Sequence, residues 1–324
     1  MRAALCKTFG GPELIEVGEI ADPEPGPGEV LIRIEAAALN YFDTLIIRDK
    51  YQFKPKLPFA PAAEIAGRIE RLGSGVAGLV PGDRVMAYLG WGGAAEKAVV
   101  KAEVVARLPD SVSAEVGAGL SVTYGTAMHG LIDRGKLRAG ETLVVLGASG
   151  GAGLAAVEVG ARLGARVIAC ASSATKLEAA RAHGATETVD YSSADLKAAL
   201  KELGGTKGID VVYDCVGGPY AEPAVRALGW EGRFLIVGFA AGDIPKLPLN
   251  LLLLKSASAV GVFWGAFLKQ VPGGHAAHMR QVLDWVAAGH IRPAIHGIYP
   301  LERIAEAMST IERREAIGKV ILKP

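Results

Sequence analysis

The chain has few cysteines and no surplus of either charge. Only three cysteines stand among its 324 residues: Cys6, Cys170 and Cys215. They lie far apart, and the last two fall inside apolar runs, so we expect buried thiols in a reducing compartment rather than disulfides. Lys and Arg number 35 against 34 Asp and Glu, which leaves a formal net charge of +1. Because the sequence has no cluster of basic residues, it gives no indication of a positively charged surface that would bind nucleic acid or an anionic membrane.

Long hydrophobic runs are also missing. The longest, residues 247–254, contains Pro248 and Asn250, and no apolar stretch follows Arg2. We therefore expect neither a membrane span nor a signal peptide. Half of the residues are hydrophobic, which is enough to bury substantial cores in one large or two ordinary domains. Together these properties predict a cytoplasmic protein.

The most informative segment is an apolar run that breaks into clustered glycines. Residues 143–146 read Leu-Val-Val-Leu, glycines follow at 147, 150, 151 and 153, and apolar residues resume at 154. Glycines let the chain turn tightly beside a pyrophosphate, while N–H groups at a helix start supply donors, so we expect Gly150, Gly151, Ala152 and Gly153 to bind a dinucleotide. The spacing departs from strict G-x-G-x-x-G, which leaves a purely structural turn as the alternative.

The segment after the next apolar run bears on the choice of cofactor. Residues 165–170 predict a second buried strand, which completes a βαβ unit. NAD sites normally place Asp or Glu after this strand, but here the chain reads Ala-Ser-Ser-Ala-Thr-Lys over residues 171–176. No carboxylate repels a 2′-phosphate, and Ser172, Ser173 and Lys176 can bind one, so the sequence favours NADPH. Alternatively, the serines cap the following helix and Lys176 is a solvated surface lysine.

The pattern of predicted elements changes near residue 115. Before it, short candidate strands at 3–6, 30–37, 65–72 and 94–100 are separated by Pro- and Gly-rich turns. After residue 153, helices and strands alternate, with strands expected at 209–213, 234–237 and 258–263 and helices at 195–203, 221–228, 279–288 and 301–311. This alternation predicts an α/β fold with a doubly wound parallel sheet.

Several short motifs carry a family resemblance. They are Ala-Ala-Leu-Asn at 37–40 followed by Asp43 and Tyr51, Glu-Ile-Ala-Gly at 64–67, Gly-Asp-Arg-Val at 82–85, the glycine turn from 148, and the tail 314–319. Together they resemble the medium-chain dehydrogenase/reductase superfamily, and within it the zinc-free NADPH:quinone oxidoreductase branch, over essentially the whole chain. Two small residues depart from the family pattern: Ala62 replaces a usual glycine and Ala152 a usual valine.

The resemblance implies a domain organisation. A GroES-like β-barrel would begin in residues 1–117 and be completed by residues 263–324, with a Rossmann domain inserted over residues 118–262. It also implies a homodimer joined near the edge strand of the nucleotide sheet.

The ligands of a catalytic zinc ion are missing. The position that resembles the first cysteine ligand is Asn40, Ala63 stands before Glu64 where zinc relatives have histidine, and no four-cysteine lobe exists. Zinc needs three or four converging ligands, so we expect a zinc-independent protein. His275 and His278 have no third ligand nearby and are expected to be a solvated pair, and His129 to be a packed helix residue.

The resemblance also suggests roles for individual residues. Asn40 and Tyr51 would line the nicotinamide end, with Tyr51 donating a proton or a hydrogen bond; its alternative is loop packing beside Phe53. Thr126, Tyr191 and Arg314 are implied neighbours of the cofactor. Two segments that follow predicted strands supply candidate pocket walls, Phe239, Phe263 and Gly265, although Phe263 and Trp264 could instead belong to a subunit interface.

A zinc-free site suits electrophilic acceptors that take a hydride directly. The leading hypothesis is therefore an NADPH-dependent reductase of quinones or related conjugated carbonyls. An enoyl-thioester or 2-alkenal reductase is the enzymatic alternative, and a nonenzymatic NADPH-binding protein is the other. The last is disfavoured because Asn40, Asp43 and Tyr51 all accompany the cofactor signature.

Overall fold

A computed structural model describes all residues, 1–324, and divides the chain into two compact units. Unit 1 comprises residues 1–122, 279–289 and 293–324, and unit 2 comprises residues 123–278 and 290–292. The expected boundaries at 117/118 and 262/263 are therefore shifted. Residues 263–278 belong to unit 2 rather than to the C-terminal part, because Phe267 stacks on His129, with their ring centroids 4.1 Å apart.

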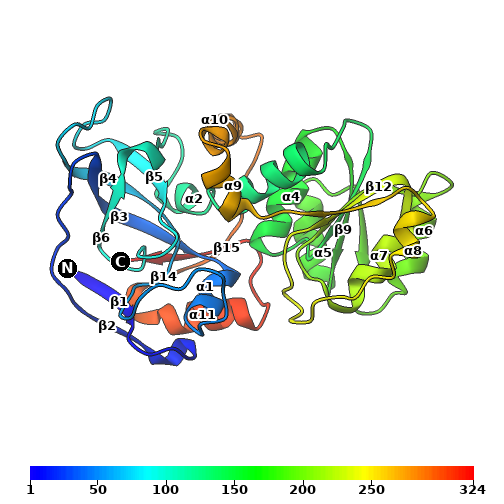
Figure 1. The fold of residues 1–324 in the computed structure, drawn as a ribbon, viewed down its shortest axis with the longest axis horizontal. Helices are drawn as coiled ribbons and strands as arrows, with labels where there is room; N and C mark the ends of the chain where they lie inside the picture. Colours follow the sequence, from blue (N-terminus) through cyan, green and yellow to red (C-terminus); the bar gives the residue numbers. More distant parts are fainter. The chain divides into compact units, whose positions relative to one another are not determined.

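Unit 2 is built on a six-stranded parallel sheet with the order β10-β9-β8-β11-β12-β13. Figure 1 labels two of these strands, β9 and β12. The strand order is that of dinucleotide-binding sheets, in which the order reverses between the first and fourth strands, here β8 and β11. The central strands form because they are continuous apolar runs, buried on both faces. The strands are β8 (Thr142–Leu146), β9 (Arg166–Ala171), β10 (Glu187–Asp190), β11 (Ile209–Asp214), β12 (Leu228–Ile236) and β13 (Ser258–Gly261).

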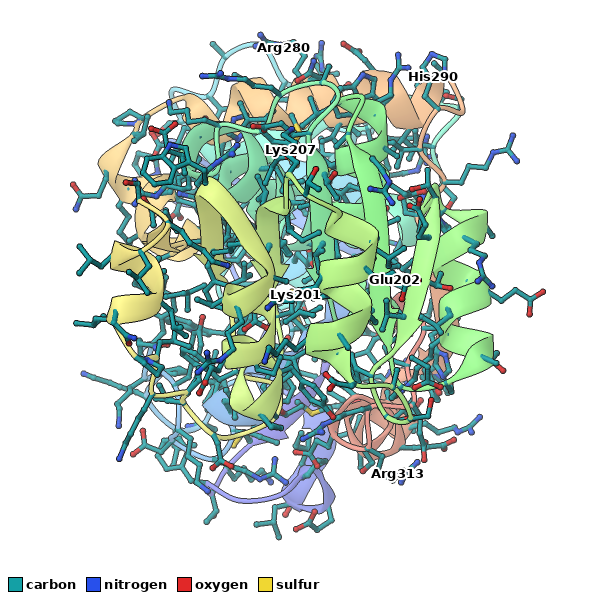
Figure 2. The ribbon with its side chains drawn as sticks, turned by 90° about the vertical axis from the view of Figure 1, so that its right-hand side faces the viewer. Lys201, Glu202, Lys207, Arg280, His290 and Arg313 are labelled. Atoms are coloured by element: carbon teal, nitrogen blue, oxygen red, sulfur yellow. The ribbon has the colours of Figure 1, made fainter.

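Helices cover both faces of this sheet. Ser173 and Asp195 begin α5 and α6 by accepting a hydrogen bond from the backbone N–H three residues later. Leu196 and Leu200 of α6 join the core, while Lys201 and Glu202 are exposed on its outer side (Figure 2). The helices are α3 (Thr123–Met128), the π-helix η3 (His129–Arg134), α4 (Gly151–Arg162), α5 (Ala174–Ala182), α6 (Leu196–Gly204), the short η4 (Gly218–Tyr220), α7 (Ala221–Ala227), α8 (Asn250–Leu253) and α9 (Trp264–Gln270).

Unit 1 contains a seven-stranded sheet and a two-stranded one. The larger sheet has the order β14-β15-β3-β4-β5-β7, with β6 also paired to β3, and β1 pairs with β2. Register shifts in the β3–β4 pair, between Leu31 and Ile32 and between Ile34 and Ala36, bend the long central strand. The strands are β1 (Arg2–Cys6), β2 (Ile15–Glu19), β3 (Glu29–Leu39), β4 (Glu64–Leu72), β5 (Arg84–Tyr88), β6 (Lys97–Lys101), β7 (Val105–Arg107), β14 (Ile295–Pro300) and β15 (Lys319–Lys323).

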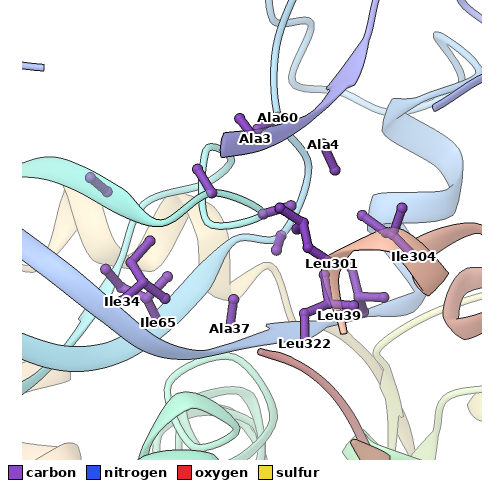
Figure 3. Close-up of a cluster of buried hydrophobic side chains, with 14 of the residues drawn as sticks. Ala3, Ala4, Ile34, Ala37, Leu39, Ala60, Ile65, Leu301, Ile304 and Leu322 are labelled. Carbon is purple, nitrogen blue, oxygen red and sulfur yellow. The ribbon is translucent and has the colours of Figure 1, made fainter. Parts of the chain in front are cut away.

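The core of unit 1 joins both ends of the chain (Figure 3). Ala3 and Ala4 of β1 share it with Leu301, Ile304 and Leu322 near the C-terminus. The remaining elements are η1 (Pro12–Leu14), α1 (Tyr41–Ile46), η2 (Ala102–Val104), α2 (Ala114–Ala118), η5 (Leu301–Arg303), α11 (Ile304–Glu312) and α10 (Gly274–Ala287), which begins in unit 2. None of the helices combines the length and the apolar character that crossing a bilayer requires.

Candidate active site

A buried polar cluster in unit 1 gathers residues that are far apart in sequence. Lys319 Nζ donates to Glu64 Oε1 at 2.7 Å, to Asn40 Oδ1 at 2.6 Å and to the Leu39 carbonyl at 3.2 Å. Asn40 Nδ2 donates to Glu64 Oε1 at 3.0 Å, and the Val122 N–H donates to Glu64 Oε2 at 2.8 Å. The side chains of Lys319 and Glu64 are 5% and 1% exposed, so these charges are stabilised by each other rather than by water.

Local structure at the start of α1 fixes the position of Asn40. Asn40 is the N-cap of α1 and forms a capping box with Asp43, whose Oδ2 accepts from the Asn40 N–H at 2.7 Å. Asp43 Oδ1 accepts from the Ala62 N–H at 3.1 Å. Ala62 has a φ of 68°, a left-handed conformation that favours glycine. The family's usual glycine at this position therefore has a backbone reason, and this chain adopts the turn with alanine.

The carboxyl group of Asp43 titrates far from its ordinary range. Burial raises the pKa of Asp43 to about 7, although the N–H groups of Asn40 and Ala62 and the Lys319 ammonium act in the opposite direction. The carboxylate of Glu64 adds to the increase. Asp43 is thus a buried acid that changes charge near neutral pH.

Tyr51 of unit 1 packs against two phenylalanine rings. Its ring stacks on Phe42 with centroids 5.2 Å apart and meets the edge of Phe53 at 5.7 Å. Burial raises the pKa of Tyr51, and the carboxyl of Asp43 raises it further, so the phenol remains a hydrogen-bond donor at neutral pH. The packing of Tyr51 in its loop is therefore compatible with its serving as a hydrogen-bond donor. Burial and the neighbouring Tyr51 likewise raise the pKa of Tyr88, a residue that the sequence did not single out.

The residues around Asn40 do not fit a zinc ion. The superfamily that the sequence resembles includes members with a catalytic zinc ion, and zinc requires several thiolate, imidazole or carboxylate ligands. No group of three or more His, Cys, Asp and Glu side chains in the structure could hold a metal ion. Asn40 offers an amide oxygen that already accepts from Lys319, and Glu64 is bound to the same ammonium. A cation of the protein thus lies where a metal would need to bind.

The glycine turn of unit 2 fits a dinucleotide. Gly147 has a φ of 74°, and a Cβ on Gly153 would overlap the Gly147 carbonyl oxygen, so these glycines let α4 begin close to β8. Gly150 has an ordinary extended conformation, and a Cβ there would meet nothing nearer than 3.8 Å. Neither the backbone nor the packing of the protein requires glycine at 150, which leaves close approach of a ligand as its physical use. No side chain caps α4, so the first N–H groups of the helix, at Gly151, Ala152 and Gly153, can bind an anion.

The residues after β9 combine both expectations raised by the sequence. Ser173 caps α5 through the Lys176 N–H, while Lys176 Nζ donates to Ser172 Oγ at 3.2 Å. A hydroxyl and an ammonium therefore meet beside the cap. Tyr191 follows β10 and packs against Tyr220 at 4.3 Å.

Two carboxylates at the same sheet edge were not anticipated. Asp190 pairs in register with Ala171, and its Oδ1 accepts from the Ser192 hydroxyl at 2.6 Å. Asp214 ends β11 and accepts from the N–H groups of Val216 and Gly217 at 2.7 and 2.9 Å. Both carboxylates are therefore occupied by their own loops. An acidic residue directly after a predicted strand is the signal that could have identified them.

The remaining expected residues are distributed over both units. Thr126 lies on α3, Phe239 follows β12, Phe263 precedes α9 and Gly265 is on α9, all in unit 2. Phe263 is 48% exposed, whereas Trp264 is 5% exposed and packs against His275. Arg314, with a φ of 57°, follows α11 in unit 1, whereas Lys176 and Tyr191 belong to unit 2.

The expectation of a solvated histidine pair is wrong. Burial lowers the pKa of His275 to about 4, and burial also lowers that of His278. Their rings pack on Trp264 and Phe267 because α10 begins at residue 274 rather than 279. His129 is packed in a helix, as expected, and its Nδ1 lies 2.8 Å from Asp133 Oδ2.

Known proteins with related sequences and structures place this geometry in a family. Residues 26–110 match the alcohol dehydrogenase GroES-like domain and residues 151–288 match the family named zinc-binding dehydrogenase. Quinone oxidoreductase-like protein 2 of Rattus norvegicus is 37% identical over 99% of this chain and 91% of its own length. Quinone oxidoreductase of Homo sapiens is 32% identical over 99% of this chain and 97% of its own length.

A solved structure agrees over the full length. The Escherichia coli quinone oxidoreductase complexed with NADPH has a TM-score of 0.91 and 27% identity, and the match covers 100% of both chains. The chain therefore belongs to the medium-chain dehydrogenase/reductase superfamily, in its quinone oxidoreductase branch.

Proposed function

We propose that this protein is an NADPH-dependent, zinc-independent reductase that transfers a hydride to quinones or related conjugated carbonyls. The observation that carries the proposal is the Lys319 ammonium, which lies 2.6 Å from Asn40 Oδ1 and 2.7 Å from Glu64 Oε1. Oxidation of an alcohol in this fold relies on zinc as the Lewis acid. Acceptors that are themselves electrophilic need no such ion.

The residues of unit 2 fit NADPH. The uncapped start of α4 suits the pyrophosphate, and the Ser172 and Lys176 side chains, 3.2 Å apart, suit a 2′-phosphate. The homologous Escherichia coli enzyme was solved as a complex with NADPH, which supports the same choice here. NADPH supplies the hydride when bound.

The protein contributes orientation and hydrogen-bond donors. The capping box holds the Asn40 backbone, while Lys319 and Glu64 hold its side-chain amide, so the amide is fixed before any acceptor binds. Tyr51 retains its proton because burial and Asp43 raise its pKa. We infer that both side chains bind the acceptor, with the Tyr51 hydroxyl donating to the oxygen on which negative charge develops.

The alternative acceptors, enoyl thioesters and 2-alkenals, differ in their need for Tyr51. A quinone yields a stabilised hydroquinone anion that water can protonate, whereas an enoyl thioester yields an enolate that needs a positioned acid more strongly. General acid catalysis contributes about a hundred- to ten-thousandfold. Tyr51→Phe therefore separates the two reactions.

The test is kcat/KM for 1,4-benzoquinone, an alkenal and crotonyl-CoA in the native protein and in Tyr51→Phe. We expect efficient reduction of the quinone and a loss of no more than roughly tenfold in the variant, because orientation carries most of the rate. Tyr41→Phe, which changes a tyrosine at the first position of α1, is the matched control. Efficient reduction of the thioester but not of quinones, abolished in Tyr51→Phe, would replace the quinone assignment. Binding of NADPH without turnover of any acceptor would favour a nonenzymatic protein.

We also propose a homodimer in a reducing compartment such as the cytoplasm. The edge strand β13 has one unpaired side, and Leu249, Leu253 and Leu254 nearby in sequence are each more than 70% exposed, a combination that favours pairing with a second copy. The three cysteines are free thiols, as expected for that compartment. Light scattering that gives the mass of a single chain at working concentration would contradict the dimer.

A further inference from the structure

The cluster around Lys319 uses nearly all of its hydrogen-bonding capacity. An ammonium has three N–H donors, and those of Lys319 go to Leu39, Asn40 and Glu64. Glu64 Oε1 accepts from both Lys319 and Asn40, and Oε2 accepts from the Val122 N–H. One N–H donor remains without a partner within the cluster, the second hydrogen on Asn40 Nδ2.

The chemistry of the partners fixes the orientation of the Asn40 amide. Lys319 can only donate and the Glu64 carboxylate can only accept, so Asn40 Oδ1 must face the ammonium and Nδ2 must face the carboxylate. A flipped amide would place two donors together and two acceptors together. The remaining N–H of Asn40 consequently has a single direction.

The pairing of β15 with β3 brings the residues of this cluster together. Strand β15 pairs with β3 so that Val320 lies opposite Leu39, which brings Lys319 beside Asn40. Gly119 lies against the aliphatic part of the Lys319 side chain. A Cβ added to Gly119 would be only 3.0 Å from Lys319 Cγ. The cluster is thus assembled from β3, β4, β15 and the end of α2.

We propose that Lys319 and Glu64 are positioning residues that aim and strengthen the remaining Asn40 N–H as a donor to the carbonyl oxygen of the acceptor. A charged hydrogen bond at Oδ1 polarises the amide and makes its N–H a better donor, since hydrogen bonds in a chain reinforce one another. The inference rests on the proposed function, because it assigns the electrophilic assistance within that reaction. We therefore expect the rate of reduction of weakly electrophilic acceptors to depend on the Asn40 N–H more than that of strongly electrophilic ones.

The experiment compares acceptors of different electrophilicity in Lys319→Met. We expect kcat for 2-cyclohexenone to fall about a hundredfold, the typical effect of losing one oxyanion donor, with a much smaller fall for 1,4-benzoquinone and an unchanged Kd for NADPH. Lys319→Arg keeps the charge and should restore part of the lost kcat. Lys323→Met changes an exposed lysine of the same strand and is the matched control. An equal loss with both acceptors, or no loss, overturns the proposal.

Removing one charge from a buried pair can unfold the chain, so the double variant Glu64→Gln/Lys319→Met is measured as well. It removes both charges together and should show the same dependence on acceptor. If both variants fold and neither discriminates between acceptors, positioning by Lys319 is excluded.

A second measurement does not depend on turnover. In the ¹⁵N-labelled full chain, the Nδ2 proton of Asn40 that is bonded to Glu64 should exchange slowly with solvent, and this protection should be lost in Lys319→Met. Equal exchange in both proteins overturns the positioning role even if NADPH is oxidised. Protection in the native protein with no reduction of any acceptor contradicts instead the proposed function.

Discussion

At the end of β9, a lysine ammonium and a serine hydroxyl lie 3.2 Å apart and form the group best suited to a 2′-phosphate. The substitution Lys176→Ala removes the only formal charge of this lysine–serine pair. A charge-assisted hydrogen bond contributes roughly 1.5–3 kcal/mol, so the Kd for NADPH should rise about ten- to a hundredfold while the Kd for NADH changes little.

Fluorescence titration with both cofactors measures this preference. Lys197→Ala, an exposed lysine on α6, is the matched control and should leave both Kd values unchanged. Equal affinity of the native protein for NADPH and NADH would show that this group does not select the cofactor.

Residues with local signals were easier to predict than residues that act across the fold. The glycines of the turn and the two serines before α5 are adjacent in sequence, so the turn and the helix cap follow from short-range geometry. Lys319 meets Glu64 across 255 positions of sequence. That contact exists only because β15 and β4 both flank β3, and a single sequence does not reveal strand order. The left-handed backbone at Ala62 was likewise hidden, because alanine rarely adopts it.

On the scale of a secondary-structure element, the capping box of α1 has a consequence for stability. The folded-state pKa of Asp43 is raised from 3.8 to about 7, so the folded state binds more protons than the unfolded state between these values. Stability contributed by this group therefore falls as pH rises from about 4 to 7 and is constant above and below, with a slope of at most about 1.4 kcal/mol per pH unit.

Chemical denaturation of the native protein and of Asp43→Asn between pH 4 and 8 isolates this contribution. Burial lowers the pKa of His275 to about 4, which makes stability rise with pH in part of the same window, so the difference between the two proteins is the informative quantity. That difference should change with pH up to about 7. A difference independent of pH would mean that Asp43 titrates at its ordinary value.

Prediction of strands succeeded for the central strands of the parallel sheet and failed for several strands of unit 1, including β5. Strands β8, β9 and β11 consist mostly of buried apolar residues, and their positions were expected. Strands β2 and β14 were not anticipated, because they are short and half-exposed and show no clear apolar pattern. The start of α10 was placed too late because its first turn contains glycine, histidine and alanine rather than a hydrophobic stripe.

On the scale of the whole molecule, the fold class could be predicted from the order of the expected strands and helices along the chain. The limits of the two units could not. The chain passes from unit 1 to unit 2 after Val122 and belongs again to unit 1 from Met279. Both limits depend on which core a segment contacts. Residues 264–270 carry no sequence signal for either unit, and the contacts of Trp264 and Phe267 with His275 and His129 assign them to unit 2.

In the proposed reductase, electrophilic assistance comes from protein groups instead of a metal. The most direct measurement is the rate of NADPH oxidation by 1,4-benzoquinone after the purified protein has been treated with a strong chelator and its metal content determined. The predicted result is full kcat in protein that contains no stoichiometric zinc. Loss of activity on removal of zinc and recovery when stoichiometric zinc is restored would contradict a zinc-independent reaction.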